Sequence, residues 1–115
     1  MRGRSGRRAL VKAHLAVAVD NIETSVVEYT KLLGAEPVHV VPGEYALWRT
    51  AVLNFSIRRV PGEEGRVRHV GFERDDVDQF REYRDANGLV WETFTKEQQA
   101  EEILAAWPHV PYTPR

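Results

Sequence analysis

Two histidines occur in matching local settings along this chain of 115 residues. His14 lies within residues 11–20 and His69 within residues 67–75, and both segments have the composition of β-strands. Each segment is followed by a helix-like stretch with the motif Glu-Tyr-x4-Gly, at nearly the same spacing. A β-α unit is therefore repeated. Because imidazole is the commonest metal-binding side chain in proteins, a matched pair suggests a metal or substrate site where the repeats meet.

Strand alternation places the two histidines on faces lined by small residues. His14 shares its face with Ala16 and Ala18, and His69 shares its face with Gly71. The opposite faces hold bulky residues that should pack against helices. These residues are Leu15, Val17, Val19, Val70 and Phe72. The histidine faces would leave room for a ligand, and we expect the two imidazoles to lie in one cleft, within ~10 Å of each other.

A third ligand would complete a 2-His-1-carboxylate site. Such sites suit Fe(II), and related His/carboxylate sites also bind Zn, Mn or Ni. Glu92, on an expected strand, is the favoured third ligand. Glu73 is about 13 Å from His69 along the strand, too far to bind the same ion, and Glu44 flanks a turn and could face anywhere. The alternative for His14 and His69 is a pair of hydrogen-bonded, inert side chains, with no metal.

Other residues that could bind a metal or a ligand are expected to have structural roles instead. His39 is expected on the solvent side of a strand, and His109 lies in a proline-rich tail. Trp48 and Trp91 could line a pocket, although core packing or a dimer contact is favoured. Three arginines could bind an anionic substrate, with exposed strand charges as the favoured alternative. They are Arg49, Arg58 and Arg59.

The first repeat, residues 11–60, is predicted as a β-α-β-β-β unit. Its helix should begin after an Asp20 or Asn21 N-cap and end at Gly34. Three short strands should follow, because the segments are rich in β-branched and aromatic residues. They are expected at residues 38–41, 45–50 and 52–59.

The second repeat, residues 66–107, is predicted to begin in the same way. A strand should be followed by a helix capped by Asp75 or Asp76 and ended by Asn87-Gly88. A strand at 89–94 comes next. The repeat then breaks, because residues 95–107 carry an apolar helical stripe behind a Thr95–Gln98 capping box.

Composition limits the broader class of protein. Hydrophobic residues make up 43% of the chain and charged residues 29%, which is ordinary for one globular domain. A net charge of −1 argues against nucleic acid or membrane as partners. The absence of cysteine excludes disulfides and thiolate sites and fits a cytoplasmic protein. Residues 1–10 are expected to form a disordered basic arm, and 108–115 a coil tail.

The first β-α segment, from His14 to Pro37, resembles that of the vicinal oxygen chelate superfamily, which includes glyoxalase I, bleomycin-resistance proteins and extradiol dioxygenases. Tyr45-Ala46, residues 53–57 and His69-Val-Gly-Phe are similar to its cadmium-induced and carbon–arsenic lyase branch. The resemblance covers residues 11–94. It implies an α+β fold of paired βαβββ modules around a cleft, with a histidine of each module, here His14 and His69, binding a divalent metal.

Two functions follow from these observations. The first is a glyoxalase- or dioxygenase-like enzyme, a metal-dependent lyase, isomerase or dioxygenase with a small-molecule ligand. The second is a metal-free protein that sequesters a small molecule, in the manner of bleomycin-resistance proteins. The chain lacks the cysteine of the lyase branch, which favours the second. A truncated second module would leave sheet edges exposed, so we expect a homodimer with Trp91 and Trp107 as candidate contacts.

Overall fold

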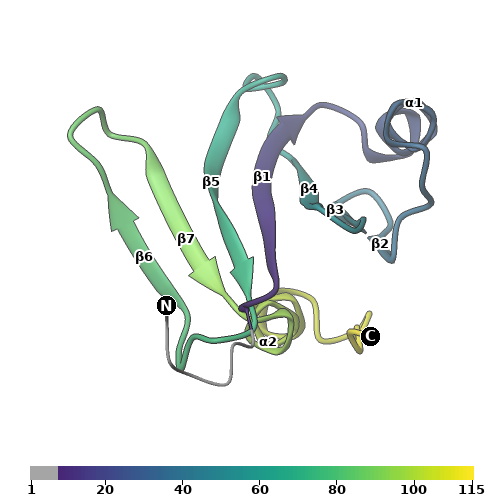
Figure 1. Cartoon of the computed structure of the whole chain (residues 1–115). Coiled ribbons are helices and arrows are strands. Elements are labelled where there is room, and N and C mark those ends of the chain that lie inside the picture. Colours follow the sequence, from purple (N-terminus) through teal and green to yellow (C-terminus); the bar gives the residue numbers. More distant parts are fainter. Residues whose placement is uncertain (1–7) are drawn as a thin grey trace, which may run out of the picture.

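Seven strands form one mixed sheet that carries a helix on each face (Figure 1). The structure, a computed structural model, describes residues 8–115, so most of the expected basic arm lies outside the described residues. The α+β class is confirmed. The elements are β1 (Val11–Val19), α1 (Ile22–Leu33), β2 (His39–Val41), β3 (Tyr45–Arg49), β4 (Leu53–Arg59), β5 (Val67–Arg74), β6 (Arg81–Arg84), β7 (Val90–Phe94) and α2 (Lys96–Ala106).

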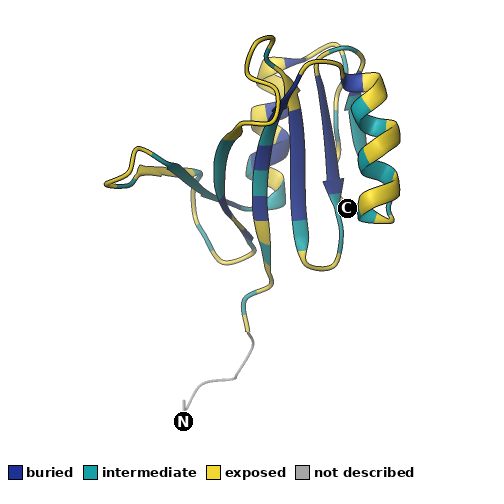
Figure 2. Cartoon of the chain, turned by 90° about the horizontal axis from the view of Figure 1, so that it is seen from above, coloured by how far each residue is buried: buried dark blue, intermediate teal, exposed yellow. Residues whose placement is uncertain are grey.

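The two strands that carry the histidines lie side by side at the centre of the sheet. The strand order is β2-β3-β4-β1-β5-β7-β6. β1 pairs with β4 in parallel and with β5 in antiparallel orientation, and β5 pairs with β7 in parallel. Each half of the sheet therefore begins with a histidine strand and continues outward from it. Figure 2 shows that buried residues concentrate in the central strands, whereas the β6–β7 end is mostly exposed or half-buried.

Helix α1 begins and ends as its sequence predicts. The Asn21 side chain accepts a hydrogen bond from the Thr24 backbone N–H, and Gly34 closes the helix in the left-handed conformation at φ 66°. Its apolar side packs against the face of the sheet that presents Trp48 and Phe55. The other members of this core include Leu15, Val17, Val19, Ile22, Val26, Tyr29 and Ile57.

Helix α2 covers the opposite face, where the histidines lie. Thr95 and Gln98 form the expected capping box, each side chain bonding the other residue's backbone N–H. Ile103 and Trp107 pack against Tyr45, and the Tyr45 and Trp107 rings lie 4.8 Å apart. Trp107 is thus buried within the chain, which contradicts its expected role as an exposed dimer contact. Residues 108–115 form no helix or strand, as expected.

The helix predicted between Asp75 and Gly88 is wrong. This segment contains bends and then strand β6, which pairs with β7 in antiparallel orientation. Asn87-Gly88 is a hairpin signal, and here it closes the turn between these strands. The Asp85 carboxylate fixes the turn by accepting hydrogen bonds from the Asn87 and Leu89 backbone and from Trp91 Nε1. The second half is therefore β-β-β-α, not a copy of the β-α-β-β-β first half.

None of the helices among residues 8–115 combines the length and the apolar character that crossing a membrane would require.

A glycine at the centre of the sheet is required by close strand packing. A Cβ at Gly71 would overlap the backbone carbonyl of Glu92 on β7, so Gly71→Ala should separate β5 from β7. We expect a loss of about 2–4 kcal/mol in the free energy of unfolding, measured by urea denaturation.

Gly88→Ala is the matched control. Gly88 also has a positive φ, 85°, but nothing lies within 4 Å of its added Cβ. Its loss should be about 1 kcal/mol, from backbone strain alone. An equal loss in the two variants would contradict the proposed packing constraint at Gly71.

Candidate metal centre

Three potential metal ligands converge on the face of the sheet covered by α2. The ligand atoms of His14, His69 and Glu92 all lie within 4.8 Å of one another. His69 Nε2 is 3.1 Å from Glu92 Oε1, and His14 Nε2 is 3.8 Å from the same oxygen. The imidazole centroids are 5.0 Å apart, which confirms the expectation that both histidines share one cleft. This group of two imidazoles and one carboxylate could hold a metal ion.

Strand register explains why these side chains meet. Asn54, His14, Gly71 and Glu92 are consecutive partners across β4, β1, β5 and β7. Gly71, which has no side chain, is the β5 residue between His14 and Glu92 in this row. His69 stands two residues along β5, paired with Ala16, whose small side chain leaves the imidazole free to lean toward Glu92.

A hydrogen bond fixes the orientation of His14. Its Nδ1 lies 2.8 Å from Asn54 Oδ1 and 3.1 Å from the Asn54 backbone oxygen. Both oxygens are acceptors, so Nδ1 must carry the proton and Nε2 presents its lone pair to the cleft. Burial, and then the neighbouring His69, lower the pKa of His14 below 6.5. Both effects favour the neutral imidazole, which is the form that binds a metal.

A buried polar chain continues from Asn54 toward the surface. Asn54 Nδ2 donates to Glu73 Oε1 and to Gln99 Oε1, both at 2.8 Å. Glu73 in turn accepts two hydrogen bonds from the Arg49 guanidinium, at 2.8 and 2.7 Å. The side chains of this hydrogen-bonded series, from Asn54 to Arg49, therefore have partners that compensate for their removal from water. Asn54 itself is fully buried, at 0% exposure.

The three glutamates considered from the sequence as possible third ligands lie in different surroundings. Glu92 lies in the three-residue group. Glu73 is not part of it, in agreement with the distance argument, and is the partner of Arg49 instead. Glu44 is exposed beside its turn and is also outside the group.

The remaining candidates lie away from the centre. His39 is half-buried, with its ring 5.0 Å from Tyr112, so its expected solvent-side position is only partly correct. His109 is exposed. Trp48 is fully buried in the α1 core, as favoured, and Trp91 stacks on Phe72 on the other face of the sheet.

The expectation of exposed strand charges holds for two of the three arginines. Arg59 is exposed and donates a hydrogen bond to the Asp20 carbonyl. Arg58 is also exposed, but it lies at the edge of the cavity beside the histidines. Arg49 is the exception, because it is half-buried and paired with Glu73.

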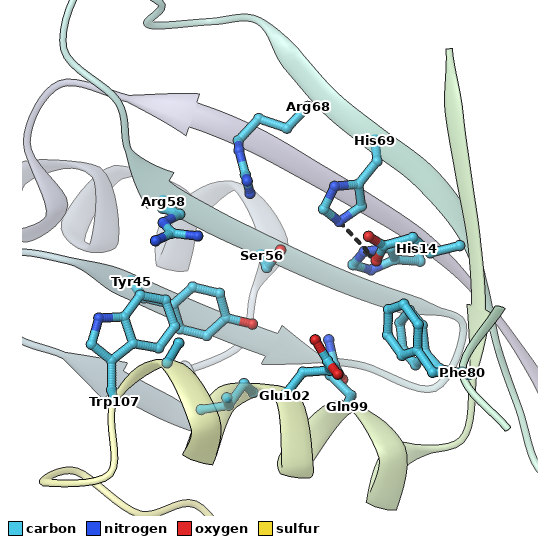
Figure 3. Close-up of a pocket in the computed structure, with 14 residues that line it drawn as sticks. His14, Tyr45, Ser56, Arg58, Arg68, His69, Phe80, Gln99, Glu102 and Trp107 are labelled. Carbon is cyan, nitrogen blue, oxygen red and sulfur yellow. Dashed lines mark ion pairs between the residues drawn. The ribbon is translucent and has the colours of Figure 1, made fainter. Parts of the chain in front are cut away.

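The three-residue group borders a cavity of about 200 Å³ between the sheet and α2 (Figure 3). His14 and His69 lie toward one side of the cavity, and Arg58 with Trp107 toward the other. Glu92 is on the histidine side, since its Oε1 lies 3.1 Å from His69 Nε2. The remaining lining residues are Tyr45, Ser56, Arg68, Phe80, Phe94, Gln99, Glu102, Ile103 and Ala106.

Sequence reasoning missed Asn54, Gln99 and Arg68. For Asn54 a signal existed, because Asn54 and Ser56 alternate with Phe55 and Ile57 in a buried strand. A polar residue at every second position of such a strand indicates a polar cavity-facing side. Nothing comparable distinguishes Gln99, which is one of several polar residues on α2.

Comparison with known proteins adds no assignment. No family model matches the chain, and no curated protein matches it. The function is therefore inferred from the geometry of the site.

The Arg49–Glu73 pair predicts acid sensitivity. Burial alone would raise the pKa of Glu73, but hydrogen bonds from Arg49 and Asn54 offset it and lower the pKa below 4.5. A carboxyl whose pKa is depressed by folding stabilises the protein above its unfolded pKa, and that contribution disappears as pH falls through the folded pKa. Glu73→Gln should therefore destabilise the protein at pH 7, by about 1–3 kcal/mol, and flatten its loss of stability below pH 4.5.

Urea unfolding at pH 7 and pH 3.5 measures both effects. Glu28→Gln, on the exposed side of α1, removes the same charge and serves as the control. If Glu73→Gln and Glu28→Gln had the same pH dependence, the buried pair would have no special role in stability.

Proposed function

We propose that this chain is a divalent-metal-dependent enzyme of the vicinal oxygen chelate type, acting on a small molecule as a lyase, isomerase or dioxygenase. The observation that carries the proposal is the convergence of His14, His69 and Glu92 on the edge of one cavity. The parallel β1–β4 pairing of the first half and the adjacent histidine strands support it. The β-β-β-α second half departs from the paired-module pattern.

The residues present fit a metal ion. His14 Nε2 has no proton, because Asn54 holds the proton on Nδ1, and Glu92 supplies a carboxylate oxygen between the two imidazoles. Three protein ligands facing a cavity are typical of catalytic sites with an open coordination position. We propose Fe, Zn, Mn or Ni as the ion. When bound, it would act as a Lewis acid toward a substrate oxygen.

The chain's own residues orient the site and limit access of water. The Phe94 ring packs edge-on against His14 at 4.9 Å, and Phe80 stacks on Phe94 at 5.5 Å. These rings close one side of the group, so a ligand can reach it from the cavity. Asn54 restrains rotation of the His14 ring through its hydrogen bond to Nδ1, and Glu73 in turn holds the Asn54 side chain by accepting a hydrogen bond from Nδ2.

A metal-free binding protein is the second candidate. One observation favours it: His69 Nε2 and Glu92 Oε1 already lie at hydrogen-bonding distance, 3.1 Å, so the pair is satisfied without an ion. In that case the cavity would sequester its ligand and perform no chemistry on it.

Metal binding separates the two candidates. Elemental analysis of protein purified without a histidine tag, followed by calorimetric titration with Zn²⁺ and Mn²⁺, should show one ion per chain. His14→Ala, His69→Ala and Glu92→Gln should each weaken binding by at least about 100-fold, because the alanines remove a direct ligand and glutamine replaces an anionic oxygen ligand with a neutral amide.

Glu44→Gln is the matched control for Glu92→Gln, since it removes an exposed carboxylate outside the group. Its affinity should equal that of the wild type. No stoichiometric metal in the wild type, or equal affinities in Glu92→Gln and Glu44→Gln, would overturn the enzyme proposal and leave the sequestering one.

We also propose that the chain forms a homodimer through the outer face of its second half. Neither α1 nor α2 covers this face, and it exposes Phe72 and Tyr83 at 39% and 67%. Trp91 stacks on Phe72 there, at 6.1 Å. Strand β6 adds an unpaired edge, which a second copy could cover.

Light scattering at micromolar concentration should give twice the chain mass. Tyr83→Glu should shift the mass toward the monomer, because it places a charge on the proposed interface, whereas Leu32→Glu on exposed α1 should not. A monomer mass for the wild type would refute the dimer.

A further inference from the structure

Two arginines at the cavity have no carboxylate partner among the described residues. Arg58, on β4, lies at its exposed rim, and Arg68, on β5, is half-buried beside His69. Other arginines of residues 8–115, such as Arg49 and Arg74, are paired with Glu73 and Asp76. Arg68 is half-buried, makes no ion pair with the described residues and lies near the like charge of Arg58, with Glu92 and Glu63 only at longer range. Two neighbouring cations without an ion-pair partner at one cavity favour an anionic ligand.

Aromatic rings hold the exposed arginine in place. The Arg58 guanidinium lies 5.1 Å from the centroid of the Trp107 ring, and Trp107 packs on Tyr45. This cation–π contact restrains a side chain that would otherwise move freely in solvent. The Arg58 guanidinium is therefore positioned before a ligand arrives, which lowers the entropic cost of binding.

The charge of the cavity depends on the metal. Its lining includes two arginines and two carboxylates, Glu92 and Glu102. A divalent ion held by His14, His69 and Glu92 would leave positive charge in excess. Figure 3 shows Arg58 apart from His14, with Ser56 between them, whereas Arg68 lies nearer His69. The cavity therefore has two binding ends.

We propose that the ligand is a small organic anion whose carboxylate or phosphate group binds Arg58 and Arg68 while a second oxygen group faces His14, His69 and Glu92. The second contact rests on the proposed metal function. The contact with Arg58 and Arg68 does not depend on a metal ion. Arg68 provides a planar fork of N–H donors that matches an oxyanion, and the Ser56 and Tyr45 hydroxyls line the path between the ends.

Calorimetric titration with three probes tests this inference. Succinate carries an oxyanion at each end, its monoamide succinamate carries only one, and inorganic phosphate probes the arginine end alone. Succinate should bind the Zn²⁺-loaded protein at least about 10-fold more tightly than succinamate, because charge-assisted hydrogen bonds to arginine are lost with the second carboxylate. Phosphate should bind the metal-free protein, but more weakly than succinate binds the Zn²⁺-loaded protein.

Arg58→Gln and Arg68→Gln should each weaken succinate and phosphate binding by at least about 10-fold, and Arg68→Lys should have a smaller effect. Arg66→Gln is the control, because Arg66 is exposed beside β5 and pairs with Glu63 instead. Zn²⁺ affinity should stay within about threefold in all four variants, and their thermal unfolding establishes that they fold.

The outcomes distinguish this inference from the metal proposal. If Zn²⁺ does not bind but phosphate binding depends on Arg58 and Arg68, the metal proposal fails and the anion site stands. If Zn²⁺ binds but succinate and succinamate bind equally, or if the arginine variants behave like Arg66→Gln, the anion site is refuted.

Discussion

The site depends on one constraint in the sheet, the alignment of His14, Gly71 and Glu92 across three neighbouring strands. Because Gly71 has no side chain, an imidazole and a carboxylate from strands that are not neighbours approach each other above it. The same glycine permits β7 to pack closely on β5. A side chain at this position would disturb the sheet and the site together, so the architecture and the proposed chemistry share a single requirement.

Burial makes the orientation of His14 rigid. An imidazole at 4% exposure must satisfy its N–H within the protein, and Asn54 does so. Asn54 in turn needs Glu73, and Glu73 needs Arg49, because each group has been removed from water. The polar chain therefore runs from the surface to the cavity as one unit. Its far end presents an unprotonated nitrogen beside Glu92, which is the state that a metal ion requires.

Local sequence signals predicted much of this arrangement. The Asn21 and Thr95 N-caps predicted where both helices begin, and strand alternation predicted that His14 and His69 lie on one face. The helix expected before Gly88 failed because Asn87-Gly88 ends either a helix or a hairpin, and pairing with β7 decides between them. Glu92 was favoured, but Asn54 and Arg68 were missed. Their roles depend on strand register and on the position of α2, which are properties of the tertiary structure.

Anomalous X-ray diffraction from crystals soaked in Zn²⁺ would show whether His14, His69 and Glu92 together hold a metal ion. We expect one strong peak within about 2.0–2.2 Å of His14 Nε2, His69 Nε2 and a Glu92 carboxylate oxygen. His39 and His109, which lie outside this group, provide an internal comparison. A peak at either of them, with none between His14, His69 and Glu92, would show that these three residues do not form a metal site.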